Sequence, residues 1–157
     1  MNPELLEELK RSPYLIKHSK AVLKKSQEIS SNFNVDLDTV CTGALLHDVG
    51  RLKTQGIWHG IEGAQILKEH NFPAEIVRIA EVHIGAGIPQ EEARSMGLPF
   101  KDYLPLTLEE KIVAHADNLI HGTKEVPLEF VVKKWGKRMG KNHPSLDRLI
   151  KLHKELC

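Results

Sequence analysis

Residues 44–51 have the sequence Ala-Leu-Leu-His-Asp-Val-Gly-Arg, in which a histidine and an aspartate end an apolar run. The surrounding pattern predicts a helix over about 36–49, where successive residues turn by about 100°. On that helix Asp48 projects into the middle of the apolar arc and His47 lies at its edge; the arc consists of Leu37, Val40, Cys41 and Ala44. An ionised carboxylate in a core costs several kcal/mol. An arginine partner, a protonated acid and a bound cation are three open explanations.

Polar side chains face the apolar side of other predicted helices as well. Three inward histidines share a stripe with apolar neighbours, namely His18, His59 and His83, and Asp117 lies at the margin of a further apolar face. Each imidazole needs two polar partners, and one divalent cation satisfies several such groups at once. Periodicity does not show that these faces meet. A metal site and a plain helical scaffold with hydrogen-bonded core histidines therefore both remain open.

Almost every segment has a period of about 3.6 residues, which predicts an all-α fold. The length suits one domain over residues 1–157, with a core over 14–122 and C-terminal helices over 127–156 packed on it. Thr107 and Glu110 form a capping box, and Gly122 is the predicted end of their helix. We expect no strand pair. The other predicted segments are helices over 2–10, 12–31, 36–50, 59–70, 73–83, 127–139 and 144–156, a loop over 51–57, and an irregular connection over 85–106 with a short helix at 90–96.

The composition excludes several classes of protein. Lys and Arg number 22 against 21 Asp and Glu, so the formal net charge is only +1, which argues against a nucleic-acid partner. No apolar run approaches the roughly 18 residues of a membrane-spanning helix, and the acidic N-terminal stretch does not look like a signal peptide. Cys41 and Cys157 indicate neither a disulfide framework nor a cysteine-based zinc site. We expect a reduced, cytoplasmic protein without membrane association.

The order of the polar residues resembles that of a known family. His18, the pair His47-Asp48 and the distant Asp117 resemble the ligand set of the HD-domain metal-dependent phosphohydrolases. Residues 44–51 resemble the HD-x-G-K/R block of that family, and the Ala-Asp-Asn-Leu stretch at 116–119 resembles its last ligand motif. The similarity covers roughly residues 14–122. It implies a compact all-helical HD domain with metal in the helical core.

Two further histidines refine the resemblance. His59-Gly60, followed by Gly63-Ala64, is similar to the third histidine segment of the two-metal members, and His83 is similar to the fourth. By resemblance to that group, this chain is expected to hold one ion with His18, His47, Asp48 and Asp117. A second ion would be held by His59 and His83, with Asp48 bridging the two ions. Bacterial dinucleoside-tetraphosphate hydrolases show a similar order, and the overall resemblance is to small archaeal HD proteins.

Other branches of the family fit less well. Ile84 follows His83, where the branch that cleaves cyclic dinucleotides has a second histidine, and no Gly-Tyr-Pro segment follows. The HD-x-x-E motif of the deoxynucleotidase branch is missing, because Arg51 follows Gly50. These departures separate the chain from both branches, and the first of them argues against cleavage of cyclic di-GMP.

The resemblance implies a metal-dependent phosphohydrolase, either a phosphatase or a phosphodiesterase. Metal-activated water would cleave a phosphate ester or anhydride of a nucleotide or nucleoside polyphosphate. Asp48 and Arg51 are the predicted catalytic residues, and the cofactor is a divalent metal, two ions of Mn, Fe, Co, Ni, Zn or Mg. The expected partner is a phosphorylated small molecule, in particular a nucleotide. The alternative is a regulatory HD module that binds metal and nucleotide without significant turnover.

Several other side chains are candidates for substrate binding. Arg51 can bind a phosphate through two hydrogen bonds, or it can act as the cation at a helix C-terminus. Lys53 and His121 are further candidates; the alternatives are a solvated lysine and a histidine beside the metal ligands. Trp58 can stack on a base or pack in the fold. The basic run over 133–138 is interpreted as a solvated helix face, although it can also guide an anionic substrate.

Overall fold

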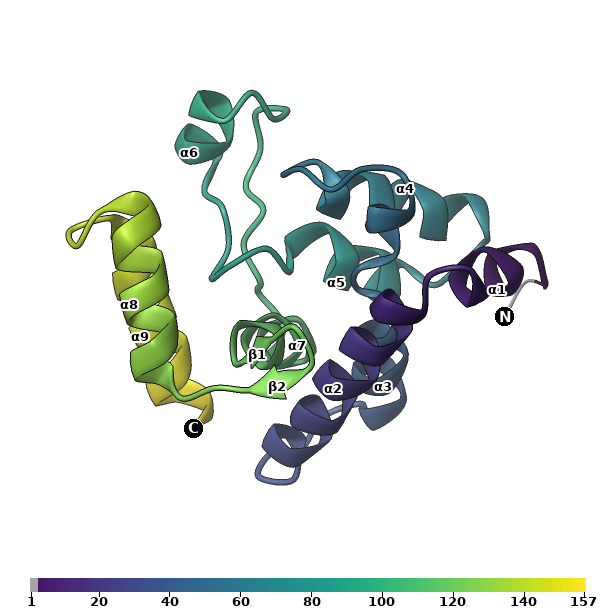
Figure 1. The fold of residues 1–157 in the computed structure, drawn as a ribbon, viewed down its shortest axis with the longest axis horizontal. Helices are drawn as coiled ribbons and strands as arrows, with labels where there is room; N and C mark the ends of the chain where they lie inside the picture. The colour runs from purple at the N-terminus through teal and green to yellow at the C-terminus, as the bar shows by residue number, and fades with distance from the viewer. Residues whose placement is uncertain (1–2) are drawn as a thin grey trace.

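The computed structural model describes residues 3–157, which form helices over most of their length (Figure 1). This confirms the all-α fold that the periodicity predicts. In chain order the elements are α1 (Pro3–Lys10), α2 (Pro13–Ser30), α3 (Leu37–Leu46), the 3-10 helix η1 (Val49–Leu52), α4 (His59–Glu69), α5 (Ala74–Val82), α6 (Gln90–Ser95), α7 (Leu108–Asn118), β1 (Ile120–His121), β2 (Lys124–Glu125), α8 (Leu128–Met139) and α9 (Pro144–Leu156).

The main hydrophobic core lies where α2, α3, α5 and α7 pack against one another. Each of these helices contributes a side chain that is almost fully buried: Val22, Val40, Ile79 and Ile112. A smaller core lies beneath α1 and α4. Burial of apolar surface at about 25 cal/mol per Å² is the main force that holds such helices together. The site described below lies between the two cores, where α2, α3, α4, α5 and α7 come together.

Helix α3 ends at Leu46 rather than near Gly50, and the chain then tightens into η1. The reason is the close packing of η1 on α4. A Cβ at residue 50 would collide with the carbonyl oxygen of His59 and would lie only 2.7 Å from the backbone nitrogen of Gly63. Only glycine allows this approach. The predicted loop over 51–57 therefore begins after Leu52.

The end of α7 also differs from the prediction. The capping box at Thr107 and Glu110 is present, but the helix ends at Asn118 and not at Gly122. The next residues form a short antiparallel pair in which Ile120 faces Glu125. Gly122 provides the turn with a positive φ of 68°, which a β-carbon would disfavour. The expectation of no strand pair was wrong at this point.

The irregular connection over 85–106 is tied to the rest of the fold at several points. Ile88 and Tyr103 exchange two backbone hydrogen bonds of 2.9 and 2.7 Å, which close the segment around α6. Arg78 donates to the carbonyl oxygen of Leu104 at 2.8 Å. These contacts give the segment a defined path over one face of the domain.

Helices α8 and α9 lie side by side at the opposite side of the molecule from α1 and α4 (Figure 1). Trp135 of α8 and Leu149 of α9 belong to the main hydrophobic core, and α9 packs directly on α7. Among residues 3–157, no helix has both the length and the apolar character that crossing a membrane requires.

Candidate metal centre

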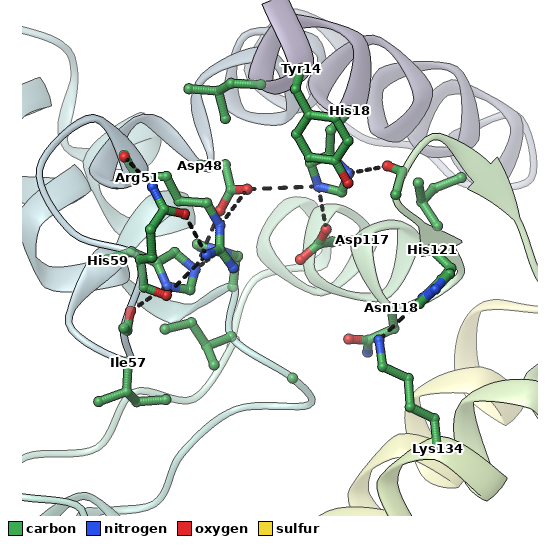
Figure 2. A pocket seen from close by; sticks show the side chains of 18 of the residues that line it. Tyr14, His18, Asp48, Arg51, Ile57, His59, Asp117, Asn118, His121 and Lys134 are labelled. Carbon is green, nitrogen blue, oxygen red and sulfur yellow. Dashed lines mark hydrogen bonds and ion pairs between the residues drawn. The ribbon is translucent and has the colours of Figure 1, made fainter. Parts of the chain in front are cut away.

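The predicted metal ligands come together at the junction of five helices. Figure 2 shows His18, Asp48, His59 and Asp117 directed into one cleft. His47 and His83 complete the group, and both are almost fully buried at 0% and 1% exposure. His18 lies on α2 and Asp117 on α7, whereas the other four residues lie at the ends of α3, α4 and α5.

All four histidines are held by the same kind of contact. In each of them Nδ1 faces a backbone carbonyl oxygen, with distances of 2.6 Å for His18 to Gly122, 2.7 Å for His47 to Ala44, 2.9 Å for His59 to Gly56 and 2.7 Å for His83 to Ala80. A carbonyl can only accept a hydrogen bond, so Nδ1 must carry the proton and donate. In the neutral ring the other nitrogen, Nε2, then presents a lone pair. This orientation is the usual one for metal-binding histidines.

The inner nitrogens crowd around Asp48. Its Oδ1 lies 3.3 Å from Nε2 of His59 and 3.3 Å from Nε2 of His83. These two Nε2 atoms are themselves only 3.1 Å apart. Two lone pairs facing each other at that distance, beside a carboxylate oxygen, repel one another. The arrangement requires either an added proton or a cation.

A second group of donors surrounds Asp117. Its Oδ1 lies 2.9 Å from Nε2 of His18 and 3.4 Å from Nε2 of His47. Nε2 of His47 is buried and has no hydrogen-bond partner among the described residues. A buried polar atom without a partner costs about 1–3 kcal/mol. His18, His47 and Asp117, like His47, Asp48 and His83, bring their donor atoms close enough together to share one ion.

The electrostatics of the metal-free chain support the same interpretation. Burial opposes a charge on His47, but the carboxylates of Asp117 and Asp48 outweigh it and raise the pKa of His47 to about 9. Burial alone would raise the pKa of Asp48, yet the charge of His47 and the close imidazoles of His59 and His83 hold that pKa far below its usual range. The two acids thus draw positive charge into the centre. A divalent cation supplies this charge without added protons.

Arg51 lies beside the same centre. Its Nε donates to Asp48 Oδ2 at 3.0 Å, and one terminal nitrogen donates to the carbonyl oxygen of Gln55 at 3.1 Å. Asp48 Oδ2 also lies 3.8 Å from Nε2 of His18. One carboxylate therefore faces the two histidines of α4 and α5 with one oxygen, and Arg51 and His18 with the other.

The other two predicted substrate-binding residues lie in different environments. His121 lines the cleft from β1 rather than from α7, and Lys134 of α8 approaches its Nδ1 at 3.3 Å (Figure 2). Lys53 is half-exposed, faces Glu62 at 4.0 Å and is not among the residues that line the cleft. The structure therefore brings His121 to the site and leaves Lys53 outside it.

The cleft has a volume of about 1030 Å³ and contains residues that sequence reasoning missed. Tyr14, Met96, Asn118, Trp135 and Arg138 all line it. Trp135 and Arg138 belong to the basic run over 133–138, which is therefore more than a solvated helix face. A tryptophan within a basic run was the available signal. Trp58 does not line the cleft.

Comparisons with known proteins agree with this description. Residues 15–121 of this chain match the protein family described as HD domain. The uncharacterized protein MJ0778 of Methanocaldococcus jannaschii is 53% identical over 150 residues, which are 92% of this chain and 89% of that protein. A tRNA (cytidine(56)-2'-O)-methyltransferase of Thermoplasma volcanium is 45% identical over 153 residues, which are 98% of this chain but only 45% of the methyltransferase.

A solved structure shows a related fold. The HD domain of the phosphodiesterase PgpH of L. monocytogenes, in complex with cyclic-di-AMP, superposes with a TM-score of 0.63. It is 18% identical, and the match covers 99% of this chain and 93% of that one. At that identity the likeness concerns the fold alone. The match of the HD domain family to residues 15–121, which are more than half of the chain, shows that this chain belongs to the HD domain family.

Proposed function

We propose that this HD domain is a divalent-metal-dependent phosphohydrolase that acts on a nucleotide or nucleoside polyphosphate. The observation that carries the proposal is the contact between Nε2 of His59 and Nε2 of His83 at 3.1 Å, with both Nδ1 atoms committed to backbone carbonyls. That geometry fits a bound cation. Membership of the family and a solved neighbour with a bound cyclic dinucleotide support a phosphate substrate.

The residues divide into two overlapping ligand groups. We propose that His18, His47, Asp48 and Asp117 hold one ion, and that His59, His83 and Asp48 hold a second; Asp48 has an oxygen for each. When bound, divalent ions supply Lewis-acid activation of water and neutralise phosphate charge. Histidine and carboxylate donors suit several first-row metals. The histidines add no negative charge of their own, which leaves the centre favourable for an anionic substrate.

Arg51 has a separate part in the proposal. Its Nε holds Asp48 in place, and its terminal nitrogen Nη2 donates no hydrogen bond to residues 3–157. That nitrogen is available to donate to a phosphate oxygen at the edge of the cleft. Lys134 and Arg138, which line the same cleft, add positive charge that attracts an anionic ligand.

The direct test is hydrolysis by the purified chain with Mn²⁺, Fe²⁺, Co²⁺, Ni²⁺, Zn²⁺ or Mg²⁺. Substrates are p-nitrophenyl phosphate, bis-p-nitrophenyl phosphate, mononucleotides, cyclic nucleotides and dinucleoside polyphosphates. We expect metal-dependent turnover that Asp48→Ala abolishes and that Asp38→Ala, at an exposed position of α3, preserves. Nucleotide binding without turnover for any metal would instead favour the regulatory module.

Arg51→Lys provides a finer test. It keeps a positive charge but loses the fork that contacts Asp48 and Gln55, so we expect kcat to fall about 10–100-fold while the metal content stays unchanged. Arg11→Lys, at an exposed position outside the cleft, is the matched control. Wild-type kcat in Arg51→Lys would remove Arg51 from the catalytic machinery.

A further inference from the structure

The cations that line the cleft stand on two sides of the metal centre. Arg51 lies on the side of Asp48, and His121 and Lys134 lie on the other side, beyond Asp117 (Figure 2). Within the described part of the chain, Asp48 and Asp117 are the only acidic residues that line the cleft. Their ion pairs are with histidines and Arg51. Lys134 therefore presents an exposed positive charge to a ligand in the cleft.

The contact between Lys134 and His121 determines where this histidine carries its proton. Nζ of Lys134 lies 3.3 Å from Nδ1 of His121. An ammonium group can only donate, so Nδ1 accepts and the neutral ring carries its proton on Nε2. This is the reverse of the four histidines of the metal centre, whose Nδ1 atoms donate to backbone carbonyls. His121 and Lys134 thus both offer donors, which suit an anion rather than a metal ion.

His121 is held in place by the turn that also orients a metal ligand. Gly122 forms this turn with a positive φ of 68°, and its carbonyl oxygen accepts from Nδ1 of His18 at 2.6 Å. The ring of His121 packs edge-on against Phe130 of α8, with 5.1 Å between the ring centroids. The backbone of His121 is thus one residue away from an atom that contacts a metal ligand. An anion bound by His121 and Lys134 lies next to the metal centre.

This second place for negative charge bears on the class of substrate. A phosphate monoester has one phosphate group, and the bound ions with Arg51 neutralise it at the metal centre. Donors on the other side of the centre have no phosphate to bind in a monoester, whereas a second linked phosphate brings its charge to them. The cleft, with about 1030 Å³, has room for more than one phosphate group.

We propose that His121 and Lys134 bind the second phosphate of a ligand whose first phosphate lies at the metal centre. We call the two residues the second-phosphate site. The inference rests on the proposed function and narrows its substrate class to molecules with two or more linked phosphates, such as nucleoside diphosphates or dinucleoside polyphosphates. Lys134 lies outside residues 15–121, so this preference depends on a part of the chain beyond the family match.

Binding is measured without hydrolysis by calorimetry with two phosphonates, because their P–C bonds replace the P–O bonds that water would cleave. Methylenediphosphonate carries two linked anionic groups and methylphosphonate carries one. With the chain incubated with Mn²⁺, we expect Lys134→Gln to weaken methylenediphosphonate about tenfold and His121→Phe about fivefold. Methylphosphonate, which reaches only the metal centre, should change less than about twofold in both variants.

Lys133→Gln is the matched control, because it removes the same charge from the neighbouring exposed position of α8, which does not line the cleft. The metal ligands are intact in every variant, so chelation of Mn²⁺ by the diphosphonate affects all of them alike. Circular dichroism and metal content check that each variant is folded and loaded. An equal loss in Lys133→Gln would overturn the proposal, and so would a wild-type chain that does not bind methylenediphosphonate more tightly than methylphosphonate.

The outcomes separate this inference from the proposed function. Binding of methylenediphosphonate that depends on Lys134, in a chain that hydrolyses no substrate with any metal, supports the second-phosphate site and contradicts the hydrolase. Metal-dependent hydrolysis in which Lys134→Gln leaves both the affinity for methylenediphosphonate and kcat/KM for ADP unchanged overturns the second-phosphate site and spares the hydrolase.

Discussion

Among residues 3–157, two pairs of histidines have ring nitrogens within hydrogen-bonding distance of each other, and they illustrate two ways to bury imidazoles. In the metal centre, Nε2 of His59 and Nε2 of His83 are 3.1 Å apart. Between α7 and α9, Nε2 of His115 and Nδ1 of His153 are 3.0 Å apart. The two distances are nearly equal, yet the first pair indicates a metal site and the second pair does not.

The difference lies in what faces the remaining ring nitrogens. The side-chain amide nitrogen of Asn118 lies 3.4 Å from Nδ1 of His115, so this Nδ1 accepts and the Nε2 of the same ring donates to His153. That pair is complete without a cation, although Cys157 lies near enough to form a third ligand. In the metal centre, backbone carbonyls force both outer nitrogens to donate, which turns two lone pairs toward each other.

Charge separates the metal centre, at His47, from the His115–His153 pair as well. Burial, with the nearby His153 and Lys25, lowers the pKa of His115 to about 4, so it is buried as a neutral ring. His47, beside two carboxylates, has its pKa raised to about 9. Close contact between histidines is thus weak evidence for a metal. Carboxylates among them, and donors committed to the backbone, are the stronger signs.

The largest expected contrast comes from removing one histidine of each pair. His83→Ala should lose one of two bound ions and reduce kcat about 10³-fold, since several kcal/mol of transition-state stabilisation depend on the ions. His153→Ala should keep both ions and near-wild-type turnover, and should cost about 1 kcal/mol of unfolding free energy. Metal analysis, kinetics and urea unfolding of both variants check this. Loss of an ion from His153→Ala would show that the second pair is also a metal site.

A smaller effect is expected from the packing that positions His59. Gly50→Ala places a Cβ against the carbonyl oxygen of His59, so we expect the free energy of unfolding to fall by about 1–3 kcal/mol. Because His59 is displaced, we also expect a lower affinity for the second metal ion. Gly136→Ala on α8 is the matched control, because the nearest heavy atom to its Cβ is 4.0 Å away and the residue does not line the cleft. Unfolding in urea and metal titration give both quantities. Equal stability of the two variants would contradict the close contact of η1 with α4.

The smallest effect is a pH dependence that distinguishes His47 of the metal centre from His115 of the second pair in chelator-treated protein. The pKa of His47 is about 9 when folded against an ordinary value of 6.5, so its stabilisation is complete below pH 6.5 and is lost as pH rises toward 9. The pKa of His115 is about 4 when folded, so its stabilisation is complete above pH 6.5 and is lost as pH falls toward 4. The measurement is the unfolding midpoint as a function of pH. We expect His47→Gln to reduce the loss of stability at alkaline pH, and His115→Gln to reduce the loss of stability at acid pH. If both variants changed the pH dependence on the same side, the assignment of His47 to the alkaline side and His115 to the acid side would be wrong.

The sequence predicts most of the helices because their apolar stripes have the helical period, and capping residues such as Thr107 mark where helices begin. It also identifies His18, Asp48 and Asp117 as inward-facing. Whether these side chains meet at one point depends on how the helices pack, and only the family resemblance predicted that they do. His47 was expected at the edge of an apolar arc, yet it is fully buried, because α2, α5 and α7 all pack around α3.

The remaining differences have local causes. Two-residue strands are too short to show a period of two, so the pair around Gly122 leaves no pattern in the sequence. The contribution of α8 to the cleft depends on how the C-terminal helices pack, and a basic run alone does not reveal that. Lys53 lies only two residues after Arg51 but faces Glu62, because η1 ends between them and the side chains diverge.

The central claim is that histidines from separate helices and two carboxylates bind divalent metal in the core of the domain. It is tested most directly by metal analysis of the chain purified without a histidine tag, before and after incubation with Mn²⁺, Fe²⁺, Co²⁺ or Zn²⁺, beside Asp48→Ala. We predict close to two ions per wild-type chain after incubation and almost none in the variant. A wild-type chain that binds no ion under any of these conditions would contradict the claim.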